Sequence, residues 1–100
     1  MNLDKLRRQI DRIDRNIVRL LNERAKVAIE IGEVKKAGRL PVFVPAREKQ
    51  VYAKVQESNA GPFPDPALRR IYREIMTASR SLEGVTKAKA PTKKRAARRK

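Results

Sequence analysis

The chain has 100 residues, a length that suits one small domain, and 40% of them are hydrophobic while only four are aromatic, so we expect a largely aliphatic core. It contains no cysteine and no histidine, which excludes disulfides, thiolate nucleophiles, the usual zinc sites and imidazole acid–base catalysis, and we expect no bound metal. No apolar run reaches membrane-spanning length, and residues 1–4 do not open a signal-peptide hydrophobic region. We therefore expect a cytoplasmic protein with no membrane-embedded part.

The formal net charge of +15 is unevenly distributed along the chain. Residues 85–100 carry eight Lys or Arg side chains, no acid and a single apolar side chain larger than alanine. A segment of this composition cannot bury a core and is attracted to polyanions. We therefore divide the chain into a helical domain at residues 1–84 and a disordered basic tail at residues 85–100. For the tail, weak contact with nucleic acid and a purely solubilising role both remain open.

Residues 3–37 predict one long amphipathic helix. Apolar side chains recur in alternating steps of three and four, the heptad pattern of a helix seam, at Leu3, Leu6, Ile10, Ile13, Ile17, Leu20, Val27, Ile31 and Val34. Asn2 is placed to cap the start of the helix, and Gly38 is placed to end it. Such a helix is about 52 Å long, whereas a compact domain of this size has a radius of gyration of about 13 Å. The helix must overhang a compact monomer, and we expect a second chain to cover it.

A second helix is expected from Pro45 to about Ser58, because proline is tolerated in a first helical turn. Val44 precedes it and has no side-chain acceptor for the first amides. We therefore expect the amides of Ala46 and Arg47 to be free for other partners.

A third helix is expected after the loop at residues 59–64, whose sequence is NAGPFP. Asp65 is predicted to cap this helix, which extends to about Glu83 before Gly84. No stretch has the pattern of a strand. The expected fold is all-α, with one long N-terminal helix and two shorter ones.

Arg24 is the only polar member of the heptad series. Two structural interpretations of Arg24 are open: it fixes the register of helix packing, or its guanidinium group reaches solvent. Lys35 lies eleven residues further, about 16 Å along the axis, so the two side chains could hold one small molecule. Arg7 lies about 42 Å from Lys35 and reaches the same ligand only from an antiparallel partner chain. The further polar candidates are Arg47, Glu48, Ser79 and Glu83. A cavity lined by these residues would hold several cations, few carboxylates and no nucleophile, and would suit a small dianion.

Four stretches in this order resemble the all-helical chorismate mutase family: LRRQIDRID, LLNERAKVAIEIGEVK, PVFVPAREK and GPFPDPALRRIYREIMTASRSLE. The resemblance covers residues 3 to about 84. It implies an intertwined homodimer of three-helix chains with two active sites, each built from both chains. It also implies the [3,3] rearrangement of chorismate to prephenate, in phenylalanine and tyrosine biosynthesis, without a cofactor.

The resemblance implies that two arginines bind the substrate carboxylates. Arg7 reaches in from the partner chain and Arg24 comes from the home chain. Lys35 falls on the lysine that hydrogen-bonds the ether oxygen, and Glu83 on the second partner of that oxygen. Since a carboxyl group donates only when protonated, we expect activity to be greatest at mildly acidic pH.

The remaining assignments lie around the ring of the substrate. Arg47 and Glu48 match the pair that opens the second helix, with Glu48 accepting from the ring hydroxyl, and Ser79 matches a substrate-contacting serine. Val44 stands where some relatives carry an acidic side chain, so any contact there is expected through backbone amides.

Three alternatives remain open. An isochorismate-pyruvate lyase of the same fold would use a similar cationic pocket, although Lys35 with the Arg47-Glu48 pair favours the mutase by resemblance. A basic helical nucleic-acid-binding protein would account for the charge and the tail. A domain that modulates another pathway enzyme would use the tail for docking. Because only the tail follows the third helix, we expect a stand-alone enzyme.

Overall fold

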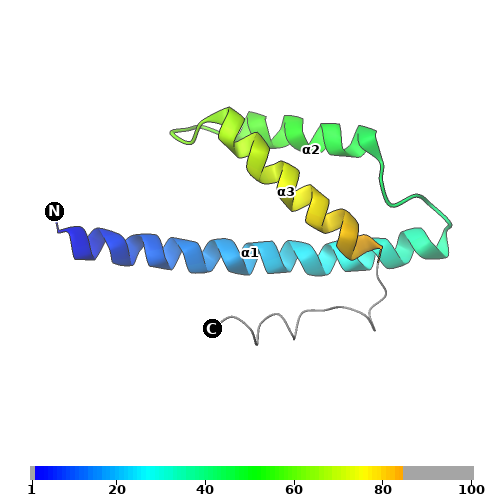
Figure 1. Cartoon of the computed structure of the whole chain (residues 1–100), viewed down its shortest axis with the longest axis horizontal. Helices are drawn as coiled ribbons and strands as arrows, with labels where there is room; N and C mark the ends of the chain where they lie inside the picture. The colour runs from blue at the N-terminus through cyan, green and yellow to red at the C-terminus, as the bar shows by residue number, and fades with distance from the viewer. Residues whose placement is uncertain (1, 85–100) are drawn as a thin grey trace.

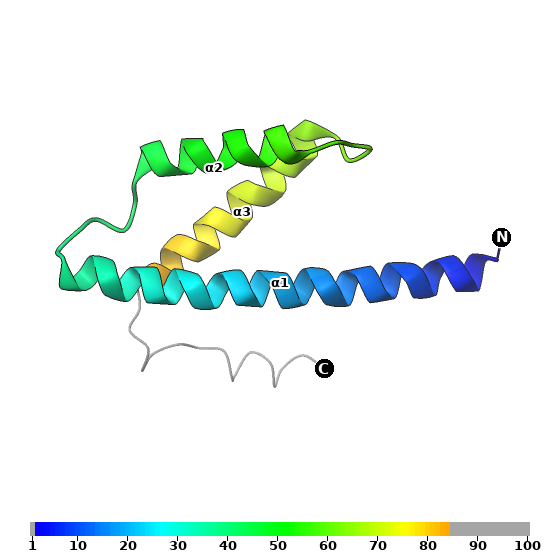
Figure 2. The same ribbon diagram turned by 180° about the vertical axis from the view of Figure 1, so that it is seen from behind.

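The computed structural model describes residues 2–84, which fold into three helices. They are α1 (Leu3–Ala37), α2 (Pro45–Ser58) and α3 (Asp65–Glu83). After α1 the chain turns back, so that α2 runs opposite to α1, and α3 then crosses diagonally to reach the C-terminal part of α1 (Figure 1; Figure 2). No residue within 2–84 forms a strand. The expected all-α, three-helix architecture is confirmed, whereas the predicted tail at 85–100 lies outside the described residues.

The first amide groups of α1 and α2 are satisfied in different ways. At α1, the Asn2 side chain accepts a hydrogen bond from the Lys5 amide at 3.1 Å, which confirms the predicted cap. At α2, the Val44 carbonyl oxygen accepts from the amides of Arg47 and Glu48 at 3.0 and 3.2 Å. The prediction that the Arg47 amide is free is wrong, because a tightened first turn brings that amide onto the Val44 carbonyl.

The start of α3 also differs from the prediction. Pro64 holds the cap position, with no side-chain hydrogen bond to the first turn, so Asp65 does not cap the helix. The Asp65 carboxylate instead accepts from Nδ2 of Asn59 at 2.7 Å, and that amide group also donates to the Phe63 carbonyl oxygen at 2.8 Å. The preceding loop thus engages the carboxylate in place of the helix. At the other end, Gly84 follows α3 as predicted.

The C-terminal end of α1 is closed by two hydrogen bonds. The Leu40 amide donates to the Lys35 carbonyl oxygen at 2.8 Å, and the Arg39 amide donates to the Lys36 carbonyl oxygen at 3.1 Å. This is the Schellman arrangement, in which the residue after the cap adopts a left-handed conformation. That residue is Arg39, with φ of 56°, whereas Gly38 has φ of −90°. The helix ends where predicted, but an arginine occupies the position that favours glycine.

α1 and α3 meet at Gly32, which is buried. A Cβ atom on Gly32 would lie 2.2 Å from the carbonyl oxygen and 2.6 Å from the Cα atom of Glu83. The two helices therefore touch backbone to backbone, an approach that a side chain at residue 32 would prevent. The crossing also brings the end of α3 beside Lys35, which lies about one turn further along α1.

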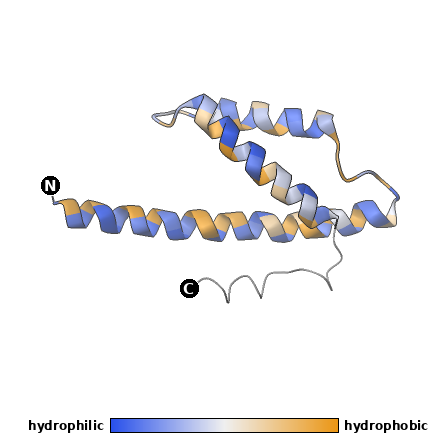
Figure 3. Cartoon of the chain, in the orientation of Figure 1, coloured by the Kyte–Doolittle hydropathy of each residue, from blue (hydrophilic) through white to orange (hydrophobic). Residues whose placement is uncertain are grey.

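The apolar stripe of α1 is not covered within this chain. Its nine heptad residues, from Leu3 to Val34, are between 40% and 68% exposed, and Ala28 and Met76 are the only buried hydrophobic residues among residues 2–84. Figure 3 shows hydrophobic bands along the whole of α1, including the N-terminal half that α3 does not reach. Within the described range, no helix combines the length and the apolar character needed to span a bilayer. The stripe therefore requires another apolar surface in water.

Candidate active site

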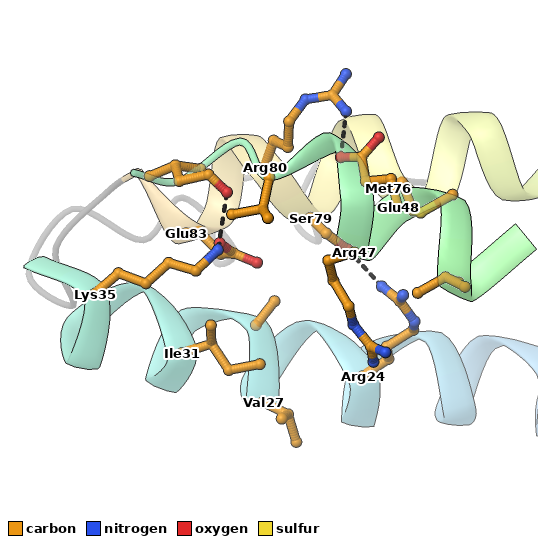
Figure 4. Close-up of a pocket in the computed structure, with 14 residues that line it drawn as sticks. Arg24, Val27, Ile31, Lys35, Arg47, Glu48, Met76, Ser79, Arg80 and Glu83 are labelled. Carbon is orange, nitrogen blue, oxygen red and sulfur yellow. Dashed lines mark hydrogen bonds and ion pairs between the residues drawn. The ribbon is translucent and has the colours of Figure 1, made fainter. Parts of the chain in front are cut away.

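A cavity of about 450 Å³ lies among α1, the start of α2 and the end of α3 (Figure 4). Apolar side chains of α1 and α3, including Ile31 and Met76, form part of its wall. Polar side chains from all three helices also line it, and seven of the eight predicted site residues are among the lining residues: Arg24, Lys35, Val44, Arg47, Glu48, Ser79 and Glu83.

Arg24 is half-buried and joins α1 to α3. Its Nη1 atom donates to the Ser79 hydroxyl oxygen at 2.6 Å, and that hydroxyl donates to the Ile75 carbonyl oxygen at 2.9 Å. The polar residue of the heptad series thus meets a neutral hydroxyl on the neighbouring helix. A guanidinium group has five N–H donors, so Arg24 retains several for an anionic ligand.

Lys35 and Glu83 form an ion pair at the other end of the cavity. Lys35 Nζ donates to Glu83 Oε1 at 2.7 Å and to the Val42 carbonyl oxygen at 2.8 Å. The two side chains are only 19% and 14% exposed. An ammonium group has three N–H donors, so one remains for a further acceptor. The two predicted catalytic groups are therefore in direct contact in a largely water-excluded place.

Glu48 forms the second ion pair of the cavity, with Arg80. Arg80 Nη1 donates to Glu48 Oε2 at 2.5 Å, which ties the first turn of α2 to the last turns of α3. The Arg80 guanidinium also lies over the Phe43 ring, 4.8 Å from its centroid. Figure 4 shows this pair on the opposite side of the cavity from α1.

The charges around the cavity are unbalanced. Four cationic side chains and two carboxylates line it, and both carboxylates are already paired, with Lys35 and Arg80. Arg24 and Arg47 form no ion pair with any residue in 2–84. Within residues 2–84, the side chain of Arg47 donates only to Oε1 of Gln50, at 3.3 Å. The excess positive charge favours a small ligand with two negative charges.

Residues 6–84 match the sequence model of the family described as chorismate mutase type II. The chain belongs to this family. Its sequence is 52% identical over 85 residues to the bifunctional chorismate mutase/prephenate dehydratase of Aquifex aeolicus, a match that covers 81% of this chain and 24% of that protein. The chain therefore spans about a quarter of the length of this curated relative.

Solved structures of the chorismate mutase family have the same fold. Chorismate mutase from Thermus thermophilus, in its form II structure, matches with a TM-score of 0.78 and 41% identity over 81% of this chain and 92% of that chain. Chorismate mutase from Helicobacter pylori, in complex with prephenate, matches with a TM-score of 0.74 and 26% identity over 81% of this chain and 88% of that chain.

Arg7 is the predicted site residue that does not line the cavity. It lies exposed near the start of α1, in the half of the helix that α3 does not reach (Figure 1). The assignment of Arg7 to a site in a partner chain stays a prediction. Val44 lines the cavity. The amide of Arg47 already donates to the Val44 carbonyl oxygen, so it is not free for the backbone contact with a ligand that was predicted at this position.

Sequence reasoning missed Arg80. The residue precedes Glu83 by three, so the two lie on the same side of the helix. That spacing was a usable signal for a cavity residue. Its partner could not be inferred, because Glu48 lies 32 positions away on another helix.

Proposed function

We propose that this chain is a chorismate mutase, an isomerase that converts chorismate to prephenate by a [3,3] rearrangement in phenylalanine and tyrosine biosynthesis. The observation that carries this proposal is the convergence of seven predicted site residues on one cavity, in a member of the chorismate mutase type II family. The cavity volume of about 450 Å³ is in the range of small-molecule sites.

The reaction requires orientation and electrostatic stabilisation. The C–O bond breaks ahead of C–C formation, so negative charge grows on the ether oxygen while the enolpyruvyl group is held over the ring. Arg24 binds a substrate carboxylate, since a guanidinium group forms two parallel hydrogen bonds with it. Lys35 donates to the ether oxygen from a fixed position with little water around it. No general base is needed, which agrees with the lack of histidine and cysteine.

The same proposal includes a homodimer. The exposed apolar stripe of α1 is self-complementary if two copies pack antiparallel around a two-fold axis, the symmetry that most homodimers have. In that arrangement the N-terminal half of one α1 lies along the C-terminal half of the other. Arg7 of one copy then approaches the cavity of its partner and supplies a further cation for the second substrate carboxylate.

The proposal is tested by incubating purified full-length protein with chorismate and following the loss of its ultraviolet absorbance. Replacing one electrostatic donor in a preorganised site costs about 100-fold or more in rate, so we expect Arg24→Ala and Lys35→Ala each to lower kcat/KM by about that factor. The matched controls are Arg19→Ala, which removes an exposed ion pair with Glu23, and Lys36→Ala, which removes the lysine next to Lys35.

Two results would contradict the proposal. Turnover near the wild-type level in both Arg24→Ala and Lys35→Ala would show that the cavity is not the reaction site. Release of pyruvate from isochorismate, without conversion of chorismate, would identify the lyase of the same fold instead. The controls should keep wild-type turnover.

A further inference from the structure

Arg80 has no assigned role in the reaction proposed above, yet it is tied into the cavity wall by three segments. It comes from α3, pairs with Glu48 of α2, and lies over Phe43 in the connection between α1 and α2. The Arg80 side chain is 35% exposed and that of Glu48 is 20% exposed, so the pair lies partly sheltered from water. Within residues 2–84, Arg80 is the only side chain that hydrogen-bonds Glu48. The position of the Glu48 carboxylate therefore depends on Arg80.

The pairing leaves Glu48 able to bind a hydroxyl group. Arg80 is bonded to Oε2, and an ionised carboxylate has acceptor sites on both oxygens. Oε1 can still accept from a neutral donor while the pair stays intact. Because the guanidinium neutralises the carboxylate, this end of the cavity offers a ligand an acceptor without a net negative charge.

A cationic donor would meet a different environment at the same place. An ammonium group next to Glu48 would also lie close to the Arg80 guanidinium, in a cavity that already holds Arg24, Lys35 and Arg47. Like charges brought together in a partly desolvated site are strongly unfavourable. A free carboxylate would attract such a group, whereas a carboxylate already neutralised by arginine does not.

We propose that Arg80 is a positioning and specificity-determining residue: it holds Glu48 and makes the cavity select a substrate with a neutral ring hydroxyl over one with a cationic ring amine. This inference rests on the proposed function, because Glu48 is taken to face the ring substituent of chorismate. Phe43 supports the selection by stacking on the guanidinium and fixing its orientation.

The test compares chorismate with its 4-amino-4-deoxy analogue, in which an amine replaces the ring hydroxyl. Steady-state kcat and KM are measured for both compounds with the full-length wild-type protein and with Arg80→Gln, Arg80→Lys and Arg73→Gln. Arg73 is an exposed arginine of the same helix that does not line the cavity, so Arg73→Gln is the matched control for the loss of one positive charge.

Arg80→Gln should raise KM for chorismate more than it lowers kcat, and should shift the preference between the two substrates by about tenfold toward the amine. Arg80→Lys keeps the charge and should restore most of the wild-type preference, while Arg73→Gln should leave it unchanged. Phe43→Leu, which leaves the ion pair but removes the stacked ring, should shift the preference in the same direction by a smaller factor. It serves as the second test if Arg80→Gln does not fold.

The two proposals fail in different ways. If the wild-type protein converts chorismate but the preference is the same in folded Arg80→Gln as in the wild type, Arg80 does not select the ring substituent and only this inference is overturned. An equal shift in Arg73→Gln would also overturn it, because the effect would then come from net charge. If the wild-type protein converts neither compound, the proposed function fails and this inference fails with it.

Discussion

Several polar residues of the cavity are bonded to each other. Arg24 bonds Ser79, and Lys35 bonds Glu83. No buried side-chain nitrogen or oxygen within residues 2–84 is without a hydrogen-bond partner. The bonds that Arg24 and Lys35 already form hold the two cations in place, while their remaining N–H donors can bind a ligand. Carboxylates form stronger hydrogen bonds with cations than neutral acceptors do, so these donors favour an anionic ligand.

The contact between Lys35 and Glu83 leads to a prediction about the ether oxygen. The ionised carboxylate of Glu83 accepts hydrogen bonds and holds Lys35, but it has no proton to donate to that oxygen. Glu83→Gln places an N–H donor at the same position, so we expect this variant to keep or raise kcat/KM for chorismate, whereas Glu83→Ala, which offers neither a donor nor a partner for Lys35, should lower it. The chorismate assay measures both variants, and equal losses in the two would rule out a contact between residue 83 and the ether oxygen.

Residue-scale prediction from the sequence worked where helix periodicity was enough. The spacing from Arg24 to Lys35 along one helix placed both side chains at one cavity, as the structure has them. The Asn2 cap was predictable because its partner Lys5 lies three residues away. The hydrogen bond of Asp65 was not predictable from helix periodicity, since its partner Asn59 belongs to the preceding loop. The spacing of Arg80 from Glu83 could have identified it as a cavity residue, but its pairing with Glu48 was not predictable, because that partner lies on another helix.

At the scale of the elements, the crossing of α1 and α3 depends on a residue that no periodicity identifies. Gly32 interrupts no pattern in the sequence, yet a Cβ atom there would overlap the backbone of Glu83. The crossing positions the last turn of α3, and with it the carboxylate that pairs with Lys35. Helix contact and site geometry are therefore coupled at this point.

Gly32→Ala should destabilise the protein by about 1–3 kcal/mol, the usual cost of overpacking, because backbone atoms cannot move aside as a flexible side chain can. It should also lower turnover, since α3 must shift and carry Glu83 away from Lys35. Thermal unfolding followed by circular dichroism and the chorismate assay measure the two effects. Gly84→Ala is the control, because its Cβ atom would find its nearest neighbours at 3.6 Å. Equal stability of the two variants would argue against the close crossing.

The end of α1 offers a stabilising substitution. Arg39 adopts φ of 56°, a conformation that costs an ordinary residue about 1 kcal/mol or more and costs glycine very little. Glycine also makes the unfolded chain more flexible, which reduces this gain. We therefore expect Arg39→Gly to stabilise the protein by up to about 1 kcal/mol. Arg39→Ala removes the same charge but keeps the conformational cost. If both variants raise the melting temperature equally, the gain comes from charge and not from the backbone.

At the scale of the whole molecule, one chain does not form a closed core. Its dimensions are 55 × 35 × 15 Å, and the smallest of these is close to the diameter of one helix with its side chains. The proposed antiparallel second copy would account both for the exposed apolar stripe of α1 and for the position of Arg7 outside the cavity. The overhang of α1 was predictable from length alone, whereas the residues that meet across such an interface depend on a register that one chain does not define.

Mixed dimers test this explanation. Arg7→Ala and Arg24→Ala should each be nearly inactive alone, because every site lacks one arginine. A mixed dimer of the two variants contains one site with Arg24 from one chain and Arg7 from the other, both intact, and one site that lacks both. If the chains are unfolded together and refolded, half of the dimers are mixed, so about one quarter of the wild-type activity should return.

The matched control combines Arg24→Ala with Lys35→Ala. Both residues line the cavity of their own chain, so every site in the mixed dimer still lacks one of them and no activity should return. Recovery in the first mixture alone therefore places Arg7 in the partner's site and shows that the dimer is the active species. Recovery in neither mixture, with dimers verified by sedimentation, would mean that Arg7 does not act across the interface. Recovery in both would mean that the home-chain cavity is assigned incorrectly.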